Sequence, residues 1–107
     1  MKAGRLNRRF ELLERSTTKD AFGGLSNTFT VAAEFWGDLR PASARRVAEM
    51  RQLDHTISHE IEIRFREGVA PGAKLRSTGR VFDVVTVYDP DDERRRLVIA
   101  AIEGRSE

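Results

Sequence analysis

The chain has 107 residues, of which 39% are hydrophobic and 34% charged, and its formal net charge is +2. A chain of this length predicts one domain with one modest core, so a large enzyme cleft is not expected. It has no cysteine, which excludes disulfides and thiolate metal sites. We expect neither a signal peptide nor a membrane span, because no stretch is apolar enough for either.

The N-terminal segment, residues 1–9, is basic and contains no acidic residue. Such a segment forms either a solvated arm or an arm that becomes ordered against an acidic neighbour. Under the second interpretation Arg5, Arg8 and Arg9 are candidate interface residues.

The first predicted strand, residues 10–15, is short and is expected at or near a sheet edge. Asp20 and the pair Gly23-Gly24 follow it, and these residues favour a turn.

Residues 28–40 resume a strand pattern in which Trp36 falls on the opposite parity to the other large apolar residues. A bulge near Glu34, or burial of the strand on both faces, would account for this change. Trp36 itself is expected in the core or at a barrel rim rather than as a platform for a ligand.

A charged excursion, about residues 41–55, interrupts the strands. Pro41 ends the preceding strand, and Ser43 can cap a short helix over residues 44–53. A helix this short is marginal unless it packs on something, so either the barrel or a neighbouring subunit must hold it. Its candidate interface residues are Arg45, Arg46, Glu49, Met50 and Arg51.

The most regular pattern is the alternation of residues 56–66. Isoleucines, His59 and Phe65 fall on one parity, and polar residues fall on the other, which predicts a strand with one face in the core and one in water. The wet face supplies four further candidate interface residues, Glu60, Glu62, Arg64 and Arg66.

The C-terminal part predicts a hairpin and a last strand. Residues 74–77 and 80–88 flank the turn Thr78-Gly79, and the second arm is apolar on both faces. A turn over residues 89–92 leads to a strand over 94–102, and residues 103–107 form a polar tail. Together these elements predict a mainly β fold, a small antiparallel barrel of about six strands with one short helix.

No residue pattern carries catalysis. His55 and His59 could share a metal ion on a helix, but on a strand they lie too far apart. The acidic run from Asp89 lacks the glycine of a calcium loop at its sixth position and is better interpreted as a self-neutralising turn. We therefore predict a non-enzyme without metal or cofactor.

The order of these signals resembles the phage head–tail joining family, which includes head-closure or stopper proteins and adaptors of tailed phages and gene-transfer particles. The resemblance runs from Gly4 to about Ile102 and depends on A-G-R-L, K-D-A-F-G-G, E-F-W-G-D-L-R-P-A-S, H-T-I-S-H-E-I-E-I-R-F-R-E-G-V-A-P, G-R-V-F-D-V-V-T-V-Y-D-P and D-E-R-R-R-L-V-I. Phe22 stands where the family often has tyrosine.

The resemblance implies a structural protein that folds as a small β-barrel with a long excursion between two strands. Copies would form a ring of six or twelve subunits between a head-side portal or adaptor and a tail-side terminator or tail-tube protein. The ring would help retain packaged DNA, which passes through it only as cargo. The protein would occupy the host cytoplasm during assembly and afterwards the neck of the particle.

The alternative from the residues is an OB-like barrel that binds nucleic acid. Such a barrel needs a basic groove with exposed aromatics. The alternating signs of Glu60, Glu62, Arg64 and Arg66 suit a protein neighbour better than a phosphate backbone.

Overall fold

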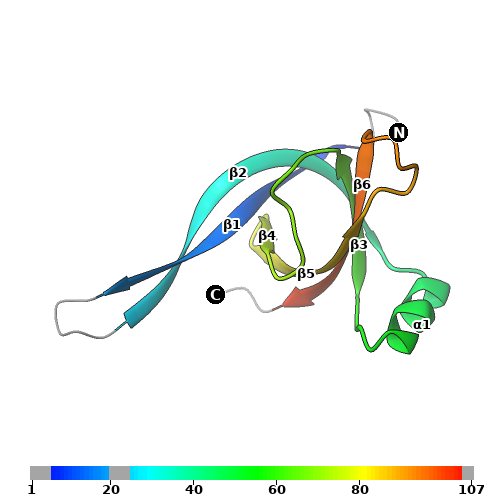
Figure 1. Ribbon diagram of the computed structural model, residues 1–107, viewed down its shortest axis with the longest axis horizontal. Helices are drawn as coiled ribbons and strands as arrows, with labels where there is room; N and C mark the ends of the chain where they lie inside the picture. Colours follow the sequence, from blue (N-terminus) through cyan, green and yellow to red (C-terminus); the bar gives the residue numbers. More distant parts are fainter. Residues whose placement is uncertain (1–5, 20–24, 105–107) are drawn as a thin grey trace.

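The structure is a computed structural model that describes residues 6–19 and 25–104. Its strands form a closed antiparallel barrel in the order β1-β2-β3-β6-β5-β4, and a single helix, α1, lies outside the barrel in the described part (Figure 1). This confirms the predicted mainly β barrel of six strands. The elements are β1 Arg8–Lys19, β2 Leu25–Pro41, α1 Ala44–Gln52, β3 His59–Arg64, β4 Lys74–Ser77, β5 Arg80–Tyr88 and β6 Arg96–Gly104.

The core fills the inside of the barrel with side chains from every strand. Phe10 of β1 lies between Phe35 and Phe82, with both ring centroids 6.3 Å away. The inward parity predicted for β3 is confirmed, since Ile61 and Ile63 are almost fully buried. The other core members are Leu12, Leu75, Val84, Leu97, Ile99 and Ala101.

Gly37 is required by this packing. A Cβ atom at this position would lie 3.0 Å from both the Ile63 and the Phe10 side chains. Contacts this short are repulsive, and a well-packed core has little room to relax. The glycine therefore allows β2 to approach β3 and β1 closely.

The predicted turn at Thr78-Gly79 is confirmed. Both residues have positive φ, 50° and 78°, which is the backbone of a type I′ hairpin turn between β4 and β5. The two apolar faces of β5 come from a register shift between Val84 and Thr86. Val85 then points to a second apolar cluster beneath α1, whereas Val84 and Val87 contact the barrel core.

The first strand is not the short edge strand that the sequence predicted. β1 runs to Lys19 and pairs with β2 along its whole length, and Glu11–Leu13 pair with β4 as well. The bulge predicted near Glu34 is present at Ala32, where Leu12 pairs with Ala33 and Leu13 with Val31. The predicted turn around residues 20–24 lies outside the described residues.

Two end assignments also change. Arg8 and Arg9 begin β1, so the basic arm is shorter than residues 1–9, and Arg5 lies outside the described residues. At the other end β6 extends to Gly104, and Glu103 forms an ion pair with Arg80 at 2.9 Å. The predicted tail therefore begins after these residues.

α1 forms where the sequence predicted a helix. The Ser43 hydroxyl accepts a hydrogen bond from the Arg46 N–H at 3.2 Å, which caps the first turn. Met50 is buried against Ile57 and Ala100 in the second apolar cluster. The barrel flank therefore holds this helix. Among the described residues no helix is long and apolar enough to cross a membrane.

Candidate protein-interface site

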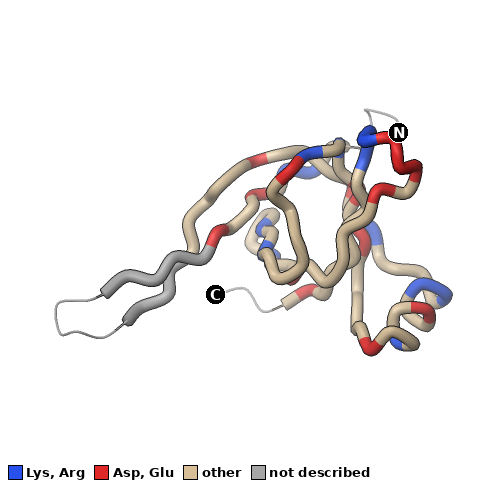
Figure 2. Tube along the Cα trace, in the orientation of Figure 1, with Lys and Arg blue, Asp and Glu red and all other residues tan. Residues whose placement is uncertain are grey.

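Charges of both signs are interleaved over the barrel and α1 (Figure 2). The predicted interface residues are divided by the structure among three surfaces and one buried network. We name the surfaces the helix flank, the rim pocket and the tryptophan pocket, and each is defined below.

The helix flank consists of the surface residues of α1 and its C-cap together with two residues of the neighbouring strands: Arg45, Arg46, Glu49, Arg51, Leu53, Glu60 and Tyr88. Arg46 lies between two carboxylates, with its Nε 3.2 Å from Glu60 and its Nη1 3.3 Å from Glu49. Arg45 also pairs with Glu49, at 3.1 Å. The Arg46 guanidinium lies 5.5 Å from the centroid of the Tyr88 ring, which is 40% exposed. The predicted grouping of charges on the helix is therefore present, with Glu60 of β3 added to it.

Two residues of the predicted helix interface differ in their availability. Met50 is only 3% exposed, so in this fold it stabilises the position of α1 and is not available to a partner. Arg51 and the C-capping Leu53 are exposed, Leu53 at 66%. The exposed surface of α1 and its C-cap thus combines charged side chains with one exposed apolar residue, Leu53.

The prediction that Glu62 lies on a wet face is wrong. Its side chain is 2% exposed, and its Oε1 accepts hydrogen bonds from Arg40 at 3.2 Å and Arg96 at 3.0 Å. Arg96 also pairs with Asp91 at 3.0 Å, which ties the acidic turn before β6 to this network. Strand parity places Glu62 outside the barrel, but the long arginine side chains of the flanking strands cover it.

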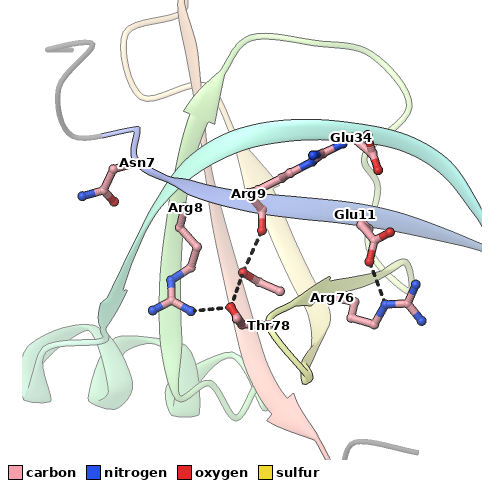
Figure 3. A pocket seen from close by; sticks show the side chains of 8 residues that line it. Asn7, Arg8, Arg9, Glu11, Glu34, Arg76 and Thr78 are labelled. Carbon is pink, nitrogen blue, oxygen red and sulfur yellow. Dashed lines mark hydrogen bonds and ion pairs between the residues drawn. The ribbon is translucent and has the colours of Figure 1, made fainter.

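The rim pocket brings together Arg8 and Arg9 from the N-terminal segment (Figure 3). Arg8 donates to the Thr78 hydroxyl at 3.3 Å, and Arg9 forms an ion pair with Glu34. The Ser77 hydroxyl, which is buried, donates to the Arg9 carbonyl at 2.7 Å. The cavity of about 620 Å³ is lined by Asn7, Arg8, Arg9, Glu11, Glu34, Arg76, Ser77 and Thr78.

One ion pair of the rim pocket joins β1 to β4. Arg76 donates to Glu11 at 2.8 Å, and this hydrogen bond lowers the pKa of the Glu11 carboxyl below its ordinary value. The same bond raises the pKa of the Arg76 guanidinium. Glutamate and arginine are both charged at neutral pH, so the pocket contains charges of both signs and is not a basic groove.

The tryptophan pocket contains the other two predicted arginines, Arg64 and Arg66. They line a cavity of about 430 Å³ together with Leu6, Phe35, Trp36 and Phe65. The Arg66 guanidinium lies 5.0 Å from the Phe35 ring centroid, in cation–π range. Trp36 is 56% exposed, so of its two predicted places, the core and the barrel rim, the core is excluded, and it lies on the outer side of β2. Its opposite parity in the sequence was the signal for this position.

Among the described residues no group of three or more His, Asp or Glu side chains is close enough to hold a metal ion. The His59 ring instead packs edge-on against Phe82, with centroids 5.5 Å apart, and its Nδ1 lies 2.8 Å from the Ser58 hydroxyl. Asp89 accepts hydrogen bonds from the Asp91 and Arg94 N–H groups, so it orders its own turn.

Comparisons with known proteins give a consistent result. A model of the family described as phage head completion protein matches residues 1–104. No curated protein matches the chain significantly. The solution structure of a protein from Shigella flexneri 2a has 23% sequence identity and a TM-score of 0.79, over the whole of both chains. A chain in the virion of a native gene transfer agent particle has 22% identity and a TM-score of 0.61, over 94% of this chain and 96% of that one.

These two structures, at such low identity, show a shared fold. The family match is more specific, since it covers nearly the whole sequence. It agrees with the resemblance to head–tail joining proteins that the sequence motifs indicated. The chain therefore belongs to the phage head completion protein family, a family of structural proteins of the phage particle.

Proposed function

We propose that copies of this chain form a ring that joins the DNA-filled head to the tail and helps to retain the packaged DNA. The family match over residues 1–104 carries this proposal. The similar fold of a chain in a gene transfer agent virion supports it. Six or twelve copies would stand between a head-side portal or adaptor and a tail-side terminator or tail-tube protein, with DNA only as cargo.

The surfaces of the barrel suit such a role. Protein interfaces have a polar rim in which hydrogen bonds and ion pairs fix the orientation of the partners. The helix flank offers both signs of charge within one short helix and β3, and its exposed Leu53 can provide an apolar contact. We propose that the helix flank contacts a neighbouring protein in the neck.

The joining role is tested by assembling particles in the absence of this protein. Heads assembled without it should be full of DNA but tailless, or should have lost their DNA, and full-length protein supplied in trans should restore tails. Electron microscopy and the DNA content of purified heads measure both effects. Tailed particles at normal yield without the chain would contradict the joining role, and a native mass of the neck complex with only one copy would contradict the ring.

The helix flank has its own test in the double variant Arg45→Glu with Arg51→Glu. Arg46 is left intact because it contacts Glu49, Glu60 and Tyr88, so its reversal would disturb the fold itself. Both substituted side chains are exposed, so the free energy of unfolding obtained from thermal melts should change by less than about 1 kcal/mol. Tail attachment should fail, whereas the matched variant Arg45→Gln with Arg51→Gln should be less impaired. Normal tail attachment by the Glu variant would exclude the helix flank as a contact.

Nucleic-acid binding is a second candidate because of the tryptophan pocket. An exposed Trp36 beside Arg64 and Arg66 is the combination of aromatic and basic groups on which single-stranded bases stack. Binding that weakens steeply with salt, and that Trp36→Ala reduces, would support this function. A connector that meets DNA only as cargo should show little or no such binding.

A further inference from the structure

The β1–β2 hairpin extends beyond the barrel wall as a two-stranded ribbon (Figure 1). We define the β-arm as residues 14–19 of β1 and 25–31 of β2. Its strands pair with each other from Glu14↔Thr30 to Lys19↔Leu25. β4 reaches β1 only at Glu11–Leu13, and β3 reaches β2 only from Gly37 onwards. Within the described chain, each strand of the β-arm therefore has one unpaired edge.

A two-stranded ribbon without a core is marginally stable in water. The β-arm also exposes large apolar side chains near its base, with Phe29 at 40% and Val31 at 43%. These residues are two apart in a strand and therefore lie on the same face. A strand added at the edge would pair with the unpaired backbone groups and place its own side chains beside this apolar stripe.

The sequence of the β2 edge lacks the usual protection against such pairing. Free edges in stable monomers commonly contain charged residues or proline, which prevent another strand from adding. From Leu25 to Ala33 the chain contains neither, although 34% of its residues are charged. The bulge at Ala32 lies at the base of the β-arm, and the register is regular from Leu25 to Val31. This edge is therefore available for pairing.

We propose that the β1 edge of one β-arm pairs with the β2 edge of the β-arm of the next copy, so that the arms form a continuous antiparallel sheet around the ring. The inference depends on the ring of the proposed function. The two free edges belong to different strands, so repeating the hairpin by rotation places β2 of one copy beside β1 of the next in antiparallel sense. A contact between two different surfaces of the same chain closes into a ring when the rotation closes.

Engineered cysteines test this pairing directly, because the native chain has none. Thr17→Cys on β1 is combined in turn with a cysteine at Phe29, Thr30 or Val31 on β2. Within one chain Thr17 pairs with Asn27, so a cysteine two or more residues further along β2 is too distant for an intrachain disulfide. Particles assembled with each full-length variant are oxidised, blocked with an alkylating agent and separated without reductant.

The proposal predicts a ladder of disulfide-linked dimers, trimers and larger multimers up to the copy number of the ring, at one or more of the three positions. Each single-cysteine variant should give monomer only. Dimers from a single-cysteine variant would show two-fold pairing and overturn the proposal, as would cross-links to a different protein.

The absence of multimers at all three positions, in neck complexes whose native mass shows an intact ring, would also overturn the arm pairing. That result would leave the proposed function in place. The absence of any ring would overturn the proposed function as well, so the two failures can be distinguished.

Discussion

β1 and β2 run through both the barrel wall and the β-arm, yet the two regions differ in what surrounds these strands. In the wall, β1 has β2 and β4 as partners, and Phe10 packs against Phe35 and Phe82. In the β-arm each strand has one partner, and Phe29 and Val31 are exposed. Backbone pairing is thus common to both regions, but only the wall adds a packed core. The stability of the chain should therefore depend on the wall, and the β-arm should be free to serve assembly.

The largest effect is expected for a charge inside the wall. Ile61→Asp would bury a carboxylate without a partner at a fully buried position, which should cost several kcal/mol or prevent folding. Val31→Asp introduces the same carboxylate in the β-arm and should cost less than about 1 kcal/mol. Thermal melts measure both, and equal losses would remove the distinction between the two regions.

A smaller loss is expected on the outer face of the wall. Glu62→Ala would leave the Arg40 and Arg96 guanidinium groups without their shared acceptor, at a cost of about 1–3 kcal/mol. The arginines are partly exposed and can find water, so the loss should stay below that of Ile61→Asp. Arg64→Ala, which removes an exposed charge from the same strand, is the matched control and should change the free energy of unfolding by less than about 0.5 kcal/mol. If Glu62→Ala and Arg64→Ala have the same melting temperature, the Glu62 network contributes nothing to stability.

In the β-arm a substitution should affect assembly more than folding. Phe29→Lys with Val31→Lys adds charged residues to the free edge, which lacks them. Because Phe29 also contacts Lys74, the double variant should lower the free energy of unfolding by about 1 kcal/mol. The incorporation of the chain into particles should nevertheless fall. Thr30→Lys, on the other face of the same strand, should have a weaker effect. Normal incorporation of the double variant would show that the β-arm is not an assembly element.

The smallest effect is expected from the exposed ion pairs of the wall. Hydrogen bonds from Arg76, Arg96 and Arg80 lower the pKa values of Glu11, Asp91 and Glu103 respectively. A lowered pKa in the folded state contributes stability above the ordinary carboxyl pKa of about 4, and this contribution is lost as the pH falls through the folded value. Arg76→Gln should therefore melt slightly lower than the native chain at pH 7, and the difference should narrow below about pH 4. A difference that does not change with pH would show that the Glu11 ion pair is not its cause.

The sequence alone determined the elements that depend on local chemistry. The alternation around Ile61, the cap at Ser43 and the turn at Thr78-Gly79 each follow from side chains a few residues apart, and each is confirmed. The same holds for the barrel class, which follows from the number and spacing of the strands. The family resemblance also required nothing beyond the order of the motifs.

Only the tertiary structure decided what covers each surface. Glu62 has the parity of an exposed residue and is buried because arginines from β2 and β6 reach over it. From the sequence, Met50 could contact either a partner protein or the flank of the barrel. It packs against Ile57 and Ala100, so it contacts the flank. The length of the β-arm was missed because residues 16–19 and 25–28 contain almost no apolar residues, so they show no strand alternation although threonine itself favours strands. Only pairing with β2 extends β1 to Lys19. Such contacts join residues distant in the chain, so local patterns do not encode them.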